Sequence, residues 1–578
     1  MNVVRFELNG QQVEVQGGLS ILEAARQHGV KIPTLCHHPD QRVKANCRVC
    51  VVEVEGQRNL VASCATTVSE GMKIRTNSSR IRETVQTILE LIFANHPQEC
   101  LTCVRNGNCE LRRLAADYGI REVKGESSCL NLPLDTSTPS LVRNPNKCIK
   151  CGRCAEVCHH VQGTGILYSN YRSVDVMVEP EYGKSLAEVA CVLCGQCASV
   201  CPVGAIHERD DISKVWKALD DPEKHVVVQV APSVRVSIAE EFGFPPGTIA
   251  TGKLVAALRK LGFDRVFDTD FSADVTIMEE GHELLQRLQT GGVLPMITSC
   301  SPGWVKYIEH NYPEQLAHLS SAKSPQQMFG ALAKTYYAKK AGINPADIYV
   351  VSIMPCTAKK FESQRPEMSD SGFQDVDAVL TTRELGRILK QAGVDFSVLE
   401  EASFDNPMGI STGAAAIFGA TGGVMEAALR TVYEVVTGQE LVNVEFSAVR
   451  GMEGIKEAEV DLAGSKVKVA VAHGLNNARE IMDLIKEGKA NYAFVEVMCC
   501  PGGCIGGGGQ PYGTTNSVRQ ERIASIYKVD ANLPLRKSHK NPAVAELYDD
   551  FLGKPLGELS HHLLHTKYKN RGLHKLKG

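Results

Sequence analysis

Two short runs of cysteine constrain this chain more than any other feature of its sequence. Each run has the spacing C-x2-C-x2-C-x3-C, with Cys148, Cys151, Cys154 and Cys158 in the first and Cys191, Cys194, Cys197 and Cys201 in the second. This spacing is typical of paired iron–sulfur sites, in which the fourth cysteine of each run binds the other cluster. The sequence therefore predicts two 4Fe–4S clusters within residues 146–210. The first three cysteines of the first run would share a cluster with Cys201, and those of the second run with Cys158.

Residues 146–210 resemble a two-cluster bacterial ferredoxin. Pro202 follows the second run, whereas His159 stands at the matching place after the first, a small departure from the family pattern.

The composition favours metal binding by the remaining cysteines as well. The chain has 21 cysteines among 578 residues and a net charge of -3. Its start, MNVVRFELNG, lacks the basic and apolar regions of a secretory signal, and no apolar run is long enough to span a membrane. We therefore expect a cytoplasmic protein whose cysteines bind metals rather than form disulfides. The nearly balanced charge gives no indication of nucleic-acid or membrane binding.

Residues 1–80 begin with two alternating runs that predict a β-hairpin turning at Asn9–Gly10. A helix is expected in LSILEAARQHG, with Ser20 as its N-cap and Gly29 beyond its end. Four cysteines follow with the spacing C-x10-C-x2-C-x13-C: Cys36, Cys47, Cys50 and Cys64. This order resembles a plant-type ferredoxin, a β-grasp domain with a 2Fe–2S cluster. Its longer first spacing is similar to the largest iron–sulfur subunit of NADH dehydrogenase. A zinc site is the alternative interpretation.

Residues 81–125 open with an amphipathic helix that ends before the pattern H-x3-C-x2-C-x5-C, formed by His96, Cys100, Cys103 and Cys109. One imidazole and three thiolates could hold zinc or a 4Fe–4S cluster. The position directly after a ferredoxin-like domain favours the cluster, since the NADH dehydrogenase subunit has the same order. Residues 126–145 are rich in Pro, Ser and Thr and are predicted to be a linker. Its cysteine, Cys129, has no matching spacing and is assigned to no cluster.

Residues 211–578 alternate apolar β-runs with helical stretches, which predicts a large α/β block with strands buried on both faces. Each of its five cysteines comes just after a β-run: Cys300, Cys356, Cys499, Cys500 and Cys504. Open α/β sheets place their sites at strand ends, so we expect these thiols to meet at one buried metal–sulfur site. The last three lie in EVMCCPGGCIGGGGQP, among six glycines that allow close approach of the backbone.

Three segments of this block, TSCSPGW, MPCTAKKFE and EVMCCPGGCIGGGGQP, resemble the signatures of the iron-only (FeFe) hydrogenases. The resemblance covers essentially the whole chain, and the TSCSPGW form is similar to catalytic subunits of multi-subunit, electron-bifurcating hydrogenases. It implies a catalytic domain over residues 211–530 and a C-terminal belt over residues 531–578. It also implies an H-cluster, in which a 4Fe–4S cube is bridged to a two-iron unit with CO, cyanide and azadithiolate ligands. The expected activity is reversible H2 oxidation and proton reduction.

The resemblance implies Cys356, Cys500 and Cys504 as ligands of the cube, with Cys504 shared with the two-iron unit. The first signature departs from the family pattern, because many members have TSCC where this chain has Cys300–Ser301. We take Cys300 as the fourth ligand, since a thiolate binds iron better than an alkoxide. In strict register, however, Cys300 would be the proton-donating thiol and Ser301 the ligand. The additional Cys499 could also supply the missing thiolate.

The resemblance further implies a proton route through Glu280, Ser320 and Glu283. The two glutamates are three residues apart and so share one face of a helix, which from the sequence alone could equally be a solvated face. A relay requires carboxylates whose pKa is raised by burial. Lys359 would provide a cation for a cyanide nitrogen. The other residues expected around the two-iron unit, which could also be plain core, are Pro232, Ser233, Gln326, Met354, Phe418 and Met498.

Electrons would pass through one 2Fe–2S and three accessory 4Fe–4S clusters to ferredoxin or to flavin-containing, NAD(P)-linked subunits. The chain shows no flavin or nicotinamide signature of its own, and the H-cluster implies maturation proteins. One alternative function is an electron-carrier subunit of an NADH dehydrogenase-like complex, which explains residues 1–210 only. Another is an H2 sensor or cluster scaffold with slow turnover.

Overall fold

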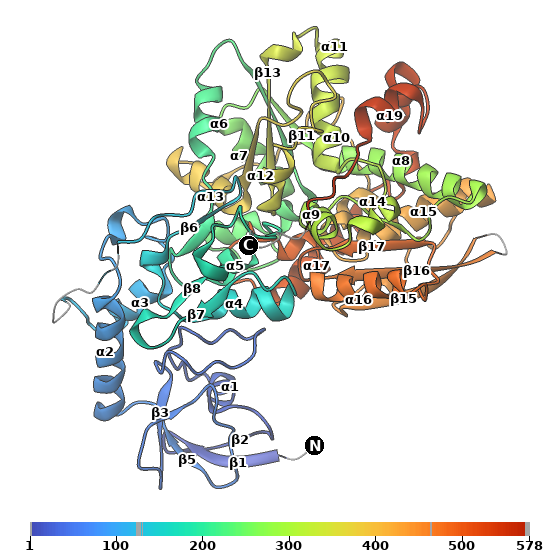
Figure 1. Ribbon diagram of the computed structural model, residues 1–578. Helices are drawn as coiled ribbons and strands as arrows, with labels where there is room; N and C mark the ends of the chain where they lie inside the picture. Colours follow the sequence, from blue (N-terminus) through green and yellow to red (C-terminus); the bar gives the residue numbers. More distant parts are fainter. Residues whose placement is uncertain (1–2, 123–128, 130, 463–464, 573–578) are drawn as a thin grey trace.

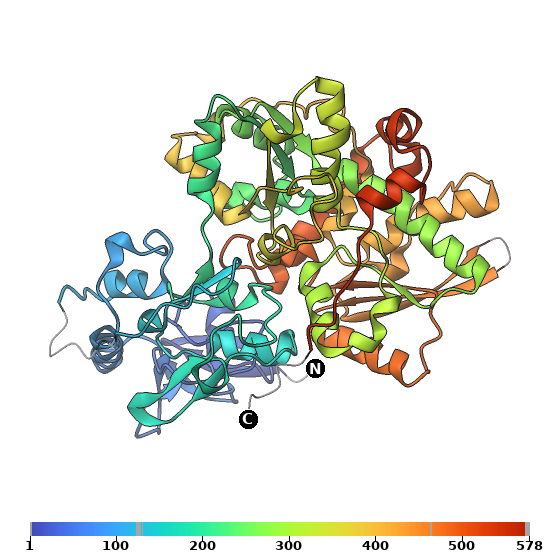
Figure 2. The same cartoon turned by 45° about the horizontal axis from the view of Figure 1, so that its top comes forward.

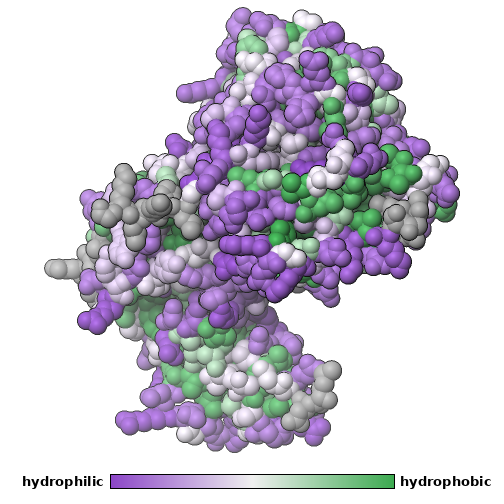
Figure 3. Space-filling view, turned by 45° about the vertical axis from the view of Figure 1, so that its right-hand side comes forward, coloured by the Kyte–Doolittle hydropathy of each residue, from purple (hydrophilic) through white to green (hydrophobic). Residues whose placement is uncertain are grey.

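The computed structural model describes residues 3–122, 129, 131–462 and 465–572. The multidomain α/β architecture is confirmed, and the N-terminal domain projects from the body as a separate lobe (Figure 1). On the face seen in Figure 3 the surface is mostly hydrophilic, with hydrophobic side chains gathered in a band across the larger part. Within the described residues, no helix has the length and apolar character needed to cross a bilayer.

The N-terminal lobe is a five-stranded sheet in the order β2-β1-β5-β3-β4. Its strands are β1 (Val3–Leu8), β2 (Gln11–Gln16), β3 (Val51–Val54), β4 (Val61–Ala62) and β5 (Lys73–Arg75). β1 and β2 form the predicted antiparallel hairpin around Asn9–Gly10. Helix α1 (Ile21–Gln27) begins at its predicted cap, where the Ser20 hydroxyl accepts a hydrogen bond from the N–H of Glu23 at 3.2 Å. The buried side of α1 packs against the sheet in a core that also contains Cys50 and Cys64.

Helices α2 (Ser79–Ala94) and α3 (Glu110–Asp117) connect this lobe to the body (Figure 1). The predicted amphipathic helix is confirmed, because Val85 and Leu89 of α2 are fully buried. They belong to a core that also contains Leu114 of α3 and Val203 of the two-cluster region. The apolar stripe of α2 therefore joins two cysteine-rich regions into one packed unit.

The two-cluster region contains strands β6 to β9 and two short helices. The strands are β6 (Leu141–Arg143), β7 (Tyr168–Asn170), β8 (Met177–Glu179) and β9 (Ile206–Glu208), and the helices are α4 (Arg153–Glu156) and α5 (Gln196–Val200). β6 pairs with β9. The predicted linker, residues 126–145, thus includes strand β6 near its C-terminal end. Its Pro, Ser and Thr content resembled a linker, but Leu141 and Arg143 are buried against β9, a contact that composition does not reveal.

The large block contains two four-stranded sheets. The first, in the order β11-β10-β13-β14, is parallel throughout and contains β10 (His225–Val230), β11 (Arg265–Asp268), β13 (Ile348–Met354) and β14 (Ala378–Thr381). The second, in the order β12-β17-β16-β15, contains β12 (Met296–Ile297), β15 (Ile455–Leu462), β16 (Ser465–His473) and β17 (Phe494–Met498). Only its edge strand β15 is antiparallel. The expected strands are confirmed, and β10, β13 and β17 are buried almost throughout.

Helices cover these sheets, as Figures 1 and 2 show. They are α6 (Ile212–Leu219), α7 (Thr251–Lys260), α8 (Thr269–Thr290), α9 (Pro302–Asn311), α10 (Pro325–Leu332), α11 (Ala338–Ala341), α12 (Ala358–Glu362), α13 (Thr382–Gln391), α14 (Gly413–Ala416), α15 (Gly423–Thr437), α16 (Leu475–Lys486), α17 (Asn516–Asn532), α18 (Pro542–Leu547) and α19 (Glu558–Leu564).

The C-terminal segment, residues 531–578, runs over the outside of this block and is described to residue 572. Its helix α18 lies against α8, and α19 lies against α10. Backbone hydrogen bonds then fix the chain to the loop before α10, from Lys323 N–H to Leu564 O and from Thr566 N–H to Ser321 O, each 2.8 Å. The segment therefore wraps the block beside the buried helix α8.

Candidate functional site

The residues that follow four parallel strands line one buried cavity between the two sheets. Pro232 follows β10, Cys300 follows β12, Cys356 follows β13 and Cys500 follows β17. The cavity is also lined by further residues expected at the site, namely Ser301, Gln326, Met354, Lys359, Phe418, Met498, Cys499 and Cys504. Ser233 is the exception: it is fully buried outside the lining, where its hydroxyl contacts Gln510.

The thiols of this cavity have properties that suit metal ligands. Removal from bulk water raises the pKa of Cys504 to about 12, and the nearby Cys500 contributes. The pKa of Cys356 is raised for the same reason and by Cys500 and Cys504 in turn. Such thiols do not ionise alone, whereas a bound metal deprotonates them directly. The donor set therefore fits an iron–sulfur cube.

Two of the sequence's departures from the family pattern lie in contact here. Cys194 and Cys500 lie close enough to the Cys499 thiol to raise its pKa, so this thiol lies between the cavity and the two-cluster region. The backbone N–H of the same residue donates to the hydroxyl of Ser301. The extra cysteine and the serine that replaces a cysteine are therefore neighbours.

The glycine run allows the loop of Cys504 to pack directly against the two-cluster region. A Cβ atom on Gly508 would lie 2.1 Å from the carbonyl oxygen of Cys194, closer than any side chain allows. The sequence suggested that these glycines serve a cofactor, but here they serve a backbone-to-backbone contact. The contact brings a predicted ligand of the last accessory cluster next to the cavity.

The cavity walls are mostly apolar, with few polar groups. Met354, Met498 and Phe418 are each at most 5 % exposed. The ammonium of Lys359 lies 2.8 Å from Glu362 and donates to the Cys300 carbonyl at 3.2 Å. The buried Oε1 of Gln326 has no hydrogen-bond partner among the described residues. This oxygen is therefore available to accept a hydrogen bond from a group bound in the cavity.

The predicted proton-route residues come together on helix α8 and the loop before α10. Glu280 is 1 % exposed, and neither of its carboxylate oxygens has a well-formed hydrogen bond within the described residues. Burial, and then the neighbouring Glu283, raise the pKa of Glu280 to about 8. The Ser320 hydroxyl donates to Glu283 at 2.9 Å, and Arg287 pairs with the same carboxylate at 2.6 Å. A solvated helix face is thereby excluded.

The four cysteines of residues 1–80 also meet. The sulfurs of Cys50 and Cys64 are 3.4 Å apart, and Cys47 lies close enough to Cys36 to lower the pKa of its thiol to about 5. Cys36, Cys50 and Cys64 are each at most 2 % exposed.

The next predicted ligand set along the chain is His96 with Cys100, Cys103 and Cys109. His96 is 6 % exposed, and its Nδ1 has no partner in the described part of the chain. Cys109 caps α3 by accepting the N–H of Arg112, and Cys103 lies against Gly204, where a Cβ would be 2.8 Å from its sulfur. Cys100 begins a short 3-10 turn, Cys100–Thr102, which directly precedes Cys103.

The two ferredoxin-like runs cross over in space. Burial and the nearby Cys201 raise the pKa of Cys151 to about 12. Burial raises the pKa of Cys191 to about 12 in turn, with contributions from Cys194 and Cys158. The fourth cysteine of each run thus lies with the other run, as the spacing predicts for a pair of clusters that exchange one ligand each.

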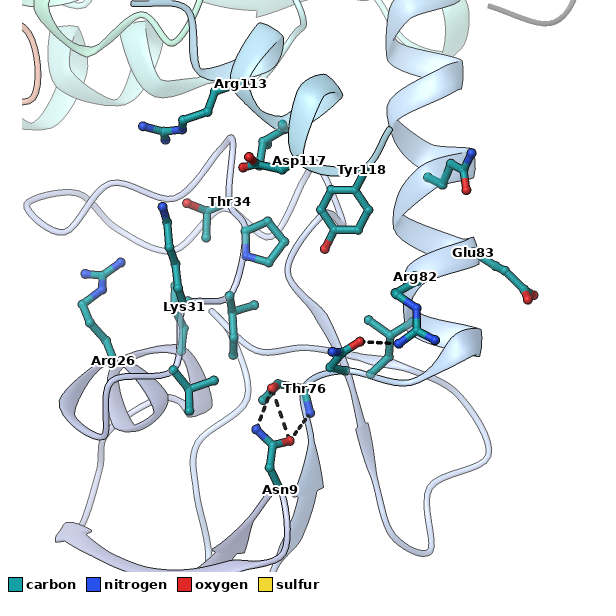
Figure 4. A pocket seen from close by; sticks show the side chains of 18 of the residues that line it. Asn9, Arg26, Lys31, Thr34, Thr76, Arg82, Glu83, Arg113, Asp117 and Tyr118 are labelled. Atoms are coloured by element: carbon teal, nitrogen blue, oxygen red, sulfur yellow. Dashed lines mark hydrogen bonds between the residues drawn. The ribbon is translucent and has the colours of Figure 1, made fainter. Parts of the chain in front are cut away.

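A second, wider groove lies away from these cysteines, between the N-terminal lobe and helices α2 and α3 (Figure 4). Lys31 and Arg113 lie on its sides, and Asn9 bonds to Thr76 at its base. No predicted site residue lines it, and no sequence motif indicated it.

Five protein-family models match successive parts of the chain. They are "2Fe-2S iron-sulfur cluster binding domain" at residues 1–79, "NADH-ubiquinone oxidoreductase-G iron-sulfur binding region" at 86–124, "4Fe-4S dicluster domain" at 144–205, "Iron only hydrogenase large subunit, C-terminal domain" at 224–508 and "Iron hydrogenase small subunit" at 516–571. The chain is also 49% identical to the NADP-reducing hydrogenase subunit HndD of Solidesulfovibrio fructosivorans, covering 99% of this chain and 100% of that one.

The chain belongs to the iron-only hydrogenase family. Iron hydrogenase 1 of Clostridium pasteurianum is 42% identical, over 97% of this chain and 99% of its own. A solved structure of a variant of the FeFe hydrogenase HydA1 from Chlamydomonas reinhardtii has a TM-score of 0.57 and 46% identity. The match covers 63% of this chain and 100% of that chain.

These findings confirm the hydrogenase prediction and the presence of accessory iron–sulfur domains in this FeFe hydrogenase. The matches at residues 1–79 and 86–124 are to iron–sulfur regions, which disfavours the zinc alternatives. A carrier subunit alone would leave the match at residues 224–508 unexplained.

Proposed function

We propose that the cavity between the two sheets holds an H-cluster at which this hydrogenase oxidises H2 and reduces protons. The single observation that carries the proposal is the meeting of cysteines from three strand ends in one apolar, buried cavity. When bound, the H-cluster supplies the redox chemistry that splits or forms H2, and the protein supplies binding, orientation and exclusion of water.

Cys356, Cys500 and Cys504 are the proposed cube ligands, and Cys504 would be the thiolate that also holds the two-iron unit. For the fourth ligand the sequence favoured Cys300, with Ser301 and Cys499 as alternatives. Cys499 is favoured by the geometry, because its thiol contacts Cys500 and its backbone contacts Ser301. Cys300 then remains available as a proton-carrying thiol, close enough to Glu280 for that carboxylate to raise its pKa, after the larger effect of burial.

Protons are proposed to move from Cys300 to Glu280 and on to Glu283. Glu280 is suited to this role because its pKa of about 8 lets it take up and release a proton near neutral pH. Ser320 and Arg287 orient the Glu283 carboxylate at the outer end. Lys359 and Gln326 are available to the polar ligands of the two-iron unit, while Met354, Met498 and Phe418 keep water away.

Electrons are proposed to pass through one 2Fe–2S and three accessory 4Fe–4S clusters. Cys194 would be the exit from the catalytic site, since its sulfur contacts that of Cys499. The similarity to HndD, an NADP-reducing hydrogenase subunit, supports NADP-linked partner subunits, and ferredoxin stays as the other predicted partner. Cytoplasmic localisation and dependence on maturation proteins also stay predictions.

The other candidate is a cluster scaffold or sensor with slow turnover. A relative named cytosolic iron-sulfur assembly component 3, from Rattus norvegicus, is 33% identical over 62% of this chain and 76% of its own. The buried Glu280 and its partners favour turnover instead, because a scaffold needs no proton route. H2 evolution with reduced viologen after cofactor maturation tests this: sustained turnover is expected, and its absence in an iron-loaded protein would favour the scaffold.

A further inference from the structure

A histidine of the C-terminal segment is hydrogen-bonded to the outer end of the proposed proton route. His565 is 5 % exposed, and its Nδ1 lies 2.8 Å from the hydroxyl oxygen of Ser321. That hydroxyl lies 3.1 Å from Oε2 of Glu283, and the backbone N–H of Ser321 donates to the same oxygen at 3.0 Å. Ser321 therefore joins Glu283 to His565 without a gap.

The other ring nitrogen of His565 contacts a second buried carboxylate. Its Nε2 lies 3.0 Å from Oε2 of Glu279, which is fully buried on α8. Glu279 also accepts hydrogen bonds from the Leu556 N–H and from the hydroxyls of Tyr548 and Ser560, all in the C-terminal segment. A carboxylate with this many donors is stabilised in its charged form. It fixes Nε2 of His565 as a donor and leaves Nδ1 to exchange hydrogen bonds with Ser321.

Ser321 has a single hydroxyl proton, so the direction of its hydrogen bonds depends on whether Nδ1 of His565 and Glu283 are protonated. When Nδ1 of His565 carries no proton, it competes with Glu283 for the Ser321 hydrogen. When Nδ1 is protonated, it donates to Ser321, whose hydroxyl must then turn toward Glu283. A proton on Glu283 can therefore pass to Ser321 while the hydroxyl proton of Ser321 passes to His565, with no change in electron count.

We propose that Glu283, Ser321, His565 and Glu279 form a branch of the proton route in which His565 takes up a proton and Glu279 stabilises the resulting imidazolium. The branch rests on the proposed function, since it starts at Glu283. The charged or titratable groups around it are Glu280 and Arg287 on α8, together with His561, whose ring stacks on His565 at 4.7 Å. His565 lies in the region that matches "Iron hydrogenase small subunit", so the C-terminal segment would contribute a proton-carrying residue as well as packing.

The test uses the complete, matured chain with the variants E283Q, S321A, H565N and E279Q. Asparagine in H565N keeps a hydrogen-bond acceptor near the position of Nδ1 but cannot take up a proton. H561Q is the matched control, because it changes the exposed histidine that stacks on the same ring. Rates of H2 oxidation are measured from pH 6 to pH 9, together with KM for H2, melting temperature and the infrared bands of the cofactor.

The branch predicts that H565N and S321A each lower kcat roughly five- to tenfold and change the shape of the pH profile, with KM and infrared bands unchanged. The double variant should be no slower than either single variant, because both residues act in one path. E279Q should resemble H565N, and H561Q should behave like the unmodified protein. If E283Q is slow while H565N keeps the original rate and pH profile, the branch is wrong and the proposed route stands. If E283Q oxidises H2 at the rate of the unmodified protein, both the branch and the proposed proton route are wrong.

Discussion

The hydroxyl oxygen of Ser301 accepts a hydrogen bond from the backbone N–H of Cys499, with 3.2 Å between the two atoms. These are the two positions at which the chain departs from the family signatures, with a serine in place of a cysteine at one and an added cysteine at the other. The sulfur of Cys499 fits here because Gly303 has no Cβ, which would lie 2.6 Å from it. The two departures are therefore neighbours, which supports the proposal that position 499 provides the thiol that position 301 lacks.

This exchange predicts different results for two small substitutions. Cys499→Ala should remove about one 4Fe–4S cluster from the protein, because the cube would lose its fourth thiolate. Ser301→Ala should leave the iron content unchanged, and the double variant S301C/C499A should restore it. Iron per chain and the electron paramagnetic resonance spectrum are measured on protein produced without maturation factors. Full iron loading in Cys499→Ala would instead assign the fourth ligand to Cys300 or Ser301.

The buried carboxyl of Glu280 predicts a pH-dependent stability effect. Its pKa rises from the ordinary 4.5 to about 8 on folding, so the folded chain binds this proton more tightly than the unfolded chain. The contribution to stability is thus lost as the pH rises from about 4.5 to about 8, at a cost on the order of a few kcal/mol. Glu280→Gln removes the free-energy cost of ionising this buried carboxyl, because glutamine does not titrate. Its melting temperature relative to the unmodified chain should rise between pH 5 and pH 8.5; a constant difference would argue against a buried neutral carboxyl.

The same variant should be a poor catalyst. Glutamine cannot relay protons, so the rate of H2 oxidation should fall by roughly 10²-fold or more. Glutamine has nearly the same shape, so iron content and infrared bands should not change. Arg121→Gln, on an exposed residue far from α8 in the sequence, serves as the control. A Glu280→Gln protein with an unchanged rate would exclude this carboxyl from the route.

The crossed arrangement of the two ferredoxin-like runs predicts that Cys201→Ser and Cys158→Ser disturb different clusters. Cys201 lies with Cys151 and Cys154, so its loss should alter the cluster of the first run. Cys158 lies with Cys191 and Cys197, so its loss should alter the other. Each variant should change one of two resonance signals and leave the second intact. Loss of the same signal in both would contradict the pairing.

A buried ion pair joins the two-cluster region to the catalytic block. Arg383 on α13 pairs with Glu208 on β9 at 2.6 Å, and both side chains are 1 % exposed. The same guanidinium donates to the carbonyl of Gly508 in the glycine run. Arg383→Ala leaves a buried carboxylate with one fewer cation, so we expect a loss of about 3–5 kcal/mol in stability. Arg5→Ala breaks an exposed pair with Glu14 and should cost under about 1 kcal/mol. Calorimetry compares the two, and equal losses would contradict the role of Arg383.

Local patterns in the sequence predicted most of the elements and the grouping of cysteines. The hairpin at Asn9–Gly10 and the cap at Ser20 depend on residues a few positions apart, and both are present. The positions of cysteines after strand ends predicted one shared cavity, because parallel strands end at the same edge of a sheet. The family resemblance predicted the other residues of the cavity lining. Of these, Ser233 alone does not line the cavity and contacts Gln510 instead.

Contacts between residues that are far apart in the chain could not be predicted from the sequence. Ser301 and Cys499 are 198 positions apart, and Ser321 and His565 are 244 apart. No spacing rule connects such residues, since only the packing of the whole block brings them together. The same limitation explains why the linker-like composition of residues 126–145 gave no indication of strand β6, because the pairing of Leu141 with Glu208 is a long-range contact.

The cavity lined by Cys356, Cys500 and Cys504 is proposed to hold an H-cluster, and every step of the mechanism depends on it. The infrared spectrum of the matured protein is the sharpest test, because CO and cyanide ligands absorb where protein groups do not. We predict bands of both ligands in the complete chain, and their loss in Cys504→Ala while the accessory clusters remain. A protein with full accessory iron, correct maturation and no CO or cyanide bands would show that the cavity holds no H-cluster.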